Sequence, residues 1–152
     1  SLPLTPNSIV PTRYPRQVDI TQVAIAEEVL VTGSPIGPPA AVLSGGETTV
    51  TICGAGTGGP DQEFALAAAP ELPESAALAS ADTDGFDGLT QYAGALVDET
   101  TATPATEARA ALATNDVTPF LQDRGDFLTT RPAGTDTDDL GITLVPSDVF
   151  DY

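Results

Sequence analysis

The chain has 152 residues, of which 22 are Asp or Glu and only 5 are Lys or Arg, so its formal net charge is -17. Neither Lys nor His occurs in it. This much negative charge repels nucleic acid and anionic lipid, so we expect neither nucleic acid nor a membrane as a partner. Molar salt would shorten the Debye length to ~3 Å and screen the repulsion. We therefore expect a salt-adapted, cytoplasmic protein from a halophile.

The hydrophobic content of 41% favours a folded domain over a disordered chain. Four prolines among residues 1–18 predict an extended arm or linker remnant, followed by one folded domain over residues 19–152. No apolar run approaches the ~20 residues that a membrane span needs. The single cysteine, Cys53, excludes an internal disulfide, and its apolar neighbours predict a buried, inert thiol.

The predicted elements alternate between helices and strands. A helix capped by Asp19 is expected to run to about Thr32 and to end at Gly33. The other expected elements are strands at 40–43 and 48–53 joined by a tight turn at Gly45 and Gly46, a helix at 61–69 with Pro60 in its first turn, a strand at 76–81, an ambiguous segment at 92–97, helices at 103–113 and 117–124, and strands at 126–129 and 142–145. This alternation predicts an α/β fold of three layers, α/β/α, with a mainly parallel sheet.

A glycine-rich segment between a strand-like run and a helix is the first candidate site. Main-chain N–H groups in such a segment can converge on a phosphate or a carboxylate. The spacing also matches a dinucleotide fingerprint, but Glu74, the acidic residue about 20 positions on, follows Pro73 in a loop, which argues against a nicotinamide cofactor. The alternative is that the glycines only make a tight bend. We call residues 54–59 the glycine loop; its candidate ligand-binding residues are Gly54, Gly56, Thr57, Gly58 and Gly59.

Two acidic loops are the other candidates. The first acidic loop, residues 82–88, carries three carboxylates that could hold Mg²⁺ or Ca²⁺, although Phe86 stands where a calcium loop needs its third ligand. In the second acidic loop, residues 134–139, the N–H groups of Gly134 and Thr135 could face a phosphate. In a chain this acidic, a solvated turn is the alternative for both loops.

Five stretches of the chain match the motifs of one family in order and spacing. They are residues 44–50, 54–64, 83–90, 115–116 and 134–140. Together they resemble the MOFRL domain, the C-terminal part of the glycerate 2-kinase family, and the resemblance extends over about residues 19–146. It implies ATP-dependent phosphorylation of the 2-hydroxyl of glycerate or a similar small acid, in a cleft shared with a larger N-terminal kinase domain or a separate subunit.

The resemblance also implies ATP and Mg²⁺ as cofactors. It assigns Asp84 and Asp87 as catalytic residues and metal ligands. The implied substrate or phosphate contacts are Glu47, Gly54, Gly56, Thr57, Gly58, Gly59, Asn115, Gly134 and Thr135.

One position departs from the family pattern in a way that affects catalysis. The family has arginine where this chain has Pro60, and proline supplies neither a charge nor an N–H group. Arg131 is a candidate substitute for the missing catalytic cation. Three hypotheses remain open: a kinase domain that works only with its missing half, a non-catalytic ligand-binding or interaction module, and a degenerate fragment or structural subunit. A homo-oligomer is possible in each case.

Overall fold

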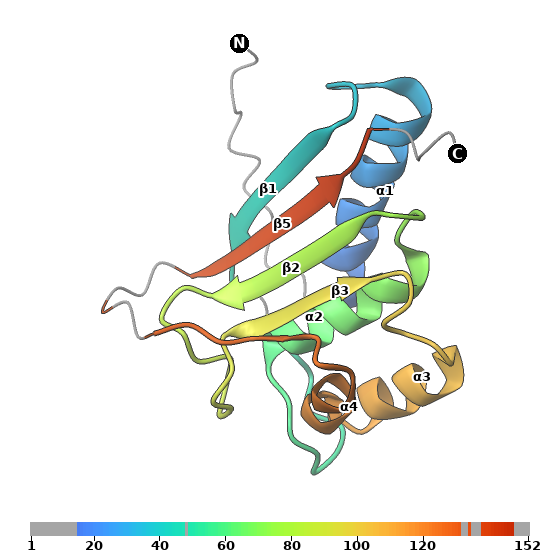
Figure 1. Ribbon diagram of the computed structural model, residues 1–152. Helices are drawn as coiled ribbons and strands as arrows, with labels where there is room; N and C mark the ends of the chain where they lie inside the picture. The colour runs from blue at the N-terminus through green and yellow to red at the C-terminus, as the bar shows by residue number, and fades with distance from the viewer. Residues whose placement is uncertain (1–14, 48, 132–133, 135–137, 148–152) are drawn as a thin grey trace.

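The computed structural model of the protein describes residues 15–47, 49–131, 134 and 138–147 (Figure 1). The elements follow in the order α1 (Pro15–Thr32), β1 (Ala40–Gly46), α2 (Pro60–Ala68), a single 3-10 turn (Ala69–Glu71), β2 (Ala77–Asp82), β3 (Gly94–Asp98), α3 (Ala105–Ala113), α4 (Val117–Arg124), β4 (Phe127–Leu128) and β5 (Asp139–Val145). Among these helices none has the length and apolar character needed to cross a bilayer.

The five strands form one sheet in the order β1-β5-β2-β3-β4. Each neighbouring pair is antiparallel. The α/β class is confirmed, but the prediction of a mainly parallel sheet is wrong. The error arose because alternating helices and strands were interpreted as parallel crossover units, whereas β2 and β3 follow each other along the chain as antiparallel neighbours and β5 returns between β1 and β2.

The helices cover one face of the sheet, so the predicted third layer is absent from the described part of the chain. In Figure 1, α1 and α2 lie behind the strands. Gln22 of α1 is hydrogen-bonded to Thr143 of β5, and Asp61 of α2 to Ser80 of β2. Thr143 lies opposite Leu78, and Leu78 and Ser80 are two residues apart on β2, so Thr143 and Ser80 point to the same face of the sheet. Both helices therefore lie on that face. We call the other side the open face.

Helix α2 lies at the centre of the domain and is buried almost all round. It packs against α1, β2, β3, α3 and α4. The small side chains of Ala65 and Ala68 allow this close approach, and Leu66 is fully buried. The surrounding core is formed by apolar residues of the sheet and of α4, among them Leu78, Val97, Val117 and Leu121.

Several element predictions need correction at their ends. Helix α1 begins at Pro15, so the predicted arm over residues 1–18 ends too late and Asp19 lies within the helix rather than capping it. Gly45 and Gly46 continue β1 opposite Leu140 and Asp139 instead of making a turn. The predicted strand at 48–53 is absent from its described residues, because they leave the sheet. The helix at 117–124 has the predicted bounds, and the ambiguous segment at 92–97 contains the start of β3.

The β2–β3 pairing predicts that Gly94 tolerates no side chain. A Cβ atom at Gly94 would overlap the main-chain oxygen of Ser80 on the neighbouring strand. We expect Gly94→Ala to lower the free energy of unfolding by about 1–3 kcal/mol in chemical denaturation, because the two strands must separate locally. Gly46→Ala is the control, since a Cβ atom there meets nothing within 4 Å. Equal stability of the two variants would contradict the pairing.

Candidate functional site

The predicted loops meet at one end of the sheet. The last residues of β1 and β2, Gly46 and Asp82, both lie opposite Asp139, the first residue of β5. Beyond them the two acidic loops touch, because the N–H and the hydroxyl of Thr83 both donate to the main-chain oxygen of Asp138, at 3.3 and 2.8 Å. The tertiary structure therefore brings the first and second acidic loops together.

The first acidic loop also contacts the start of α2. The carboxylate of Asp87 accepts hydrogen bonds from the N–H groups of Asp61, at 3.0 Å, and Gln62, at 2.8 Å. A Cβ atom on Gly59 would overlap this carboxylate, so glycine is required where the loop passes Asp87. The first N–H groups of α2 thus bind an internal carboxylate, and they are not among the predicted ligand contacts of the glycine loop.

Gln62 extends this contact into a buried network that the sequence analysis missed. Its side-chain amide nitrogen donates to Asp87 and to the hydroxyl of Thr90, both at 3.0 Å. Its amide oxygen accepts from the hydroxyl of Thr118, at 2.7 Å. Gln62 is fully buried. A polar residue in the first turn of a helix is ordinarily exposed, so the sequence does not predict that Gln62 is buried. Its place within the 54–64 motif is the one signal that it matters.

The start of the glycine loop is held by the segment before α4. The side-chain oxygen of Asn115 accepts from the N–H groups of Cys53, at 2.6 Å, and Gly54, at 3.0 Å. The carboxylate of Asp116 accepts from the N–H of Thr57, at 2.9 Å. Asn115 adopts a left-handed backbone conformation with φ of 55°. The N–H groups of Gly54 and Thr57, two of the predicted ligand contacts, therefore donate to internal acceptors.

The glycines of this loop are explained by close packing. The N–H of Gly56 donates to the main-chain oxygen of Thr114 at 3.2 Å, and a Cβ atom on Gly56 would overlap Asp116. A Cβ atom on Gly58 would lie 2.7 Å from a methyl group of Val117. Close packing thus explains the need for glycine at these two positions, while the predicted ligand contacts of the loop stay a prediction. Cys53 is exposed, so the predicted buried thiol is wrong, because residues 49–53 do not enter the sheet.

Asp61 is a buried carboxyl at the junction of α2, β2 and β5. The hydroxyl of Ser80 donates to one of its oxygens, while no described group is a hydrogen-bond partner of the other. The carboxyl of Asp139 is also a close neighbour of Asp61, and two carboxyls can share a hydrogen bond only if one of them is protonated. Burial, together with the negative charges of Asp87 and Asp139, raises the pKa of Asp61 to about 8.

The pKa of Asp87 is also raised, to about 6. Burial is the main cause, and the hydrogen bonds from the α2 N–H groups and from the side chain of Gln62 oppose it. Asp87 is thus a structural carboxylate whose negative charge is stabilised by hydrogen bonds from protein groups instead of water.

The described residues do not fit the metal site that Asp84 and Asp87 were expected to form. Both oxygens of Asp87 accept hydrogen bonds from α2. The carboxylate of Asp84 turns back on its own loop, where it accepts from the N–H of Phe86 at 2.7 Å. Across the described part of the chain, no group of three or more Asp, Glu or Cys side chains is arranged to hold a metal ion.

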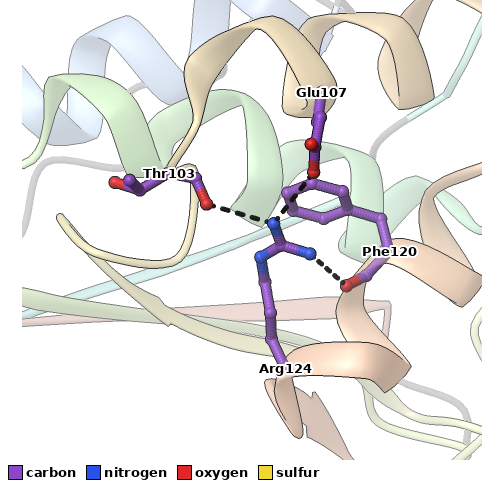
Figure 2. Close-up of polar contacts among 4 residues, drawn as sticks. All are labelled: Thr103, Glu107, Phe120 and Arg124. Atoms are coloured by element: carbon purple, nitrogen blue, oxygen red, sulfur yellow. Dashed lines mark hydrogen bonds and ion pairs between the residues drawn. The ribbon is translucent and has the colours of Figure 1, made fainter.

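The hydrogen bonds described above for the glycine loop and the two acidic loops involve none of the arginines whose side chains the structure describes. Figure 2 shows Arg124 stacked on the ring of Phe120, 3.6 Å from its centroid, where it donates to the main-chain oxygens of Phe120 and Thr103. It also forms a 3.5 Å ion pair with Glu107. Arg109 is exposed on α3, and Arg131 is exposed in the connection between β4 and β5. The role predicted for Arg131 stays a prediction.

The remaining predicted residues lie near the same sheet end or outside the described chain. Glu47 follows β1 directly and is exposed. Gly134 is exposed, with a left-handed backbone. Thr135 lies outside the described residues. Glu47 and Gly134 therefore remain candidate ligand contacts.

The buried proton on Asp61 predicts a specific pH dependence. The folded state holds this proton to about pH 8, whereas the unfolded chain releases it near 3.8, so the free energy of unfolding falls as the pH rises between these values. Asp61→Asn should remove the part of this slope between about pH 6 and 8, where Asp87 no longer contributes, and stabilise the protein at pH 8 by about 1–3 kcal/mol. The measurement is denaturation against pH at constant KCl. The exposed Asp123→Asn is the control, and equal slopes in both variants would refute the assignment.

The contacts of Asn115 predict that its side chain orders the glycine loop. Asn115→Gly preserves the left-handed backbone and removes only the side-chain bonds. We expect at least about tenfold faster amide exchange at Cys53 and Gly54, because their acceptor is lost. Thr114→Ala is the control, since its hydroxyl bonds only to carbonyls of α3. Unchanged exchange in Asn115→Gly would mean that other contacts hold the loop.

Comparison with known proteins places this geometry in one family. The chain is 40% identical over 130 residues to glycerate 2-kinase of Pyrococcus horikoshii, covering 82% of this chain and 30% of that protein. It is 41% identical over 128 residues to D-glycerate 2-kinase of Thermotoga maritima, covering 80% of this chain and 31% of that protein. The crystal structure of glycerate kinase from Thermotoga maritima superposes with a TM-score of 0.81 over 87% of this chain and 33% of that one.

This chain therefore spans about a third of the length of these relatives. The model of the MOFRL family matches residues 40–139, a range that includes β1, the glycine loop, α2 and both acidic loops up to the start of β5. The chain belongs to the MOFRL family.

Proposed function

We propose that the chain is the C-terminal domain of a glycerate 2-kinase and acts together with the larger portion that its relatives carry. The reaction is ATP-dependent phosphoryl transfer to the 2-hydroxyl of glycerate. The observation that carries the proposal is the convergence of family motifs at one sheet end, where Gly46, Asp82 and Asp139 lie in register. The similarity to two glycerate 2-kinases at 40% and 41% identity supports it.

In this proposal the domain supplies positioning rather than charge compensation. Asp87 and Gln62 fix the first acidic loop on α2, and Asn115 fixes the glycine loop on α4. Such pre-formed contacts hold exposed groups such as Glu47 and Gly134 in place without a cost at the moment of reaction. The described residues include no cluster of three Asp, Glu or Cys side chains placed to hold a metal ion. In this proposal the larger portion of the kinase therefore supplies most of the contacts to ATP and Mg²⁺.

Pro60 favours a second candidate function, a non-catalytic ligand-binding or interaction module. Pro60 is the first residue of α2 and stands where the family motif has arginine. Phosphoryl transfer needs a cation against the negative charge of the transferring group. A domain without that cation would keep the fold and the loops but would lose most of the rate of phosphoryl transfer.

A chimera tests the first function. We would replace the region of Thermotoga maritima D-glycerate 2-kinase that matches this chain with the chain itself, and measure ATP-dependent phosphorylation of glycerate in KCl. We expect activity above that of the same enzyme lacking the region. A folded chimera that shows none, with or without a restored arginine, would favour the non-catalytic module.

Restoring the cation at position 60 is a sharper test. We expect Pro60→Arg in this chimera to raise kcat/KM by about 10²-fold, the typical effect of one group that stabilises charge in the transition state. Pro60→Ala is the matched control, because it removes the proline without adding charge. If Pro60→Ala raises the rate as much as Pro60→Arg, the effect comes from the backbone of α2 and the lost-cation argument fails.

A further inference from the structure

The open face of the sheet exposes large apolar side chains. The exposed fractions are 68% for Leu43 on β1, 51% for Leu144 and 41% for Leu140 on β5, and 45% for Leu96 on β3. Strand register makes this a continuous surface, because Leu43 lies opposite Ile142, Ile142 opposite Ala79, and Ala79 opposite Leu96. Four exposed leucines in a connected patch mark an interaction surface rather than scattered surface residues.

Three of the four long strands place no acidic residue on the open face, and only β3 adds one, Asp98, which lies opposite Ala77. The chain has 22 Asp and Glu residues. The residues of β1, β5 and β2 that point to this face are nevertheless all uncharged: Ala41, Leu43, Gly45, Leu140, Ile142, Leu144, Ala77, Ala79 and Ala81. A free surface of so acidic a protein is expected to carry carboxylates on each strand, so their absence from β1, β5 and β2 favours a covered surface there.

This face is continuous with the candidate site. The register row of Gly45, Leu140 and Ala81 belongs to the open face. The next row, Gly46, Asp139 and Asp82, begins the acidic sheet end. A partner seated on the open face therefore borders the loops where the family motifs meet.

Two observations identify the occupant. A second copy would bring only the same acidic loops to the border of this surface, so it offers no complementary charge at close contact. The relatives, in contrast, carry about two thirds of their length outside the region that this chain matches. That portion must join the domain near the shared site if both contribute to one reaction.

We propose that the open face is the docking surface for this larger kinase portion, which meets it with an apolar patch and places basic side chains beside the acidic loops. The proposal rests on the proposed function for the identity of the partner. Its location rests on the exposed leucines, the strand register and the absence of charged residues from the open-face positions of β1, β5 and β2.

Radical footprinting tests the location. Oxidation of Leu43 and Leu144 would be compared between the isolated chain and the chimera with the Thermotoga maritima enzyme. We expect at least fivefold protection of both leucines in the chimera. Val31 on α1, 82% exposed, is the internal control and should react equally in both proteins.

Paired substitutions provide the second measurement. Leu43→Glu with Leu144→Glu should leave the unfolding midpoint of the isolated chain nearly unchanged, because both side chains are largely exposed. In the chimera the same pair should speed proteolysis between the two portions at least tenfold. Val31→Glu should have no such effect.

The outcomes separate the docking proposal from the proposed function. Unprotected leucines in a chimera that phosphorylates glycerate would overturn the docking surface and leave the function standing. Protection in an inactive chimera would support the surface and count against the function. If the leucines are protected in the isolated chain and its native mass is doubled, the face is covered by a second copy. If they are protected while the native mass is that of one chain, a terminus of this chain covers the face. Either result overturns the proposal.

Discussion

The capping of α2 by Asp87 is the contact on which the rest of the domain depends. Because α2 lies in the middle of the protein, its first N–H groups cannot reach water and need a buried acceptor. Asp87 supplies it across 26 residues of sequence to Asp61. Gly59 has no side chain because the carboxylate occupies that space. One charged side chain thus fixes the central helix, the first acidic loop and the end of the glycine loop together.

This arrangement changes the meaning of the glycine-rich motif. A glycine loop before a helix is typical of phosphate binding, but here the loop is a packing element whose N–H groups bond to Asn115, Asp116 and Thr114. In the proposed function, ligand chemistry at this sheet end also draws on exposed neighbours such as Glu47 and on the portion that the relatives carry.

The acidic composition divides the protein into surfaces with different roles. Carboxylates gather at the sheet end, and two of them, Asp61 and Asp87, are buried with raised pKa values. Salt screens exposed charges but leaves a buried carboxyl pair largely unscreened, so adaptation to salt does not explain Asp61. The open face carries leucines instead. Charge on one side and apolar area on the other suit a domain that has both a site and a partner.

The sequence by itself determined the α/β class, the helix at 117–124 and the family, because these follow from local periodicity and from ordered motifs. Tertiary structure decided the antiparallel strand order, the exposure of Cys53 and the role of Asp87. The physical reason is range. A helix is specified by neighbours three or four residues apart, whereas Asn115 reaches Cys53 over 62 residues of chain. Such pairings depend on which surfaces become buried together, and no local pattern carries that information.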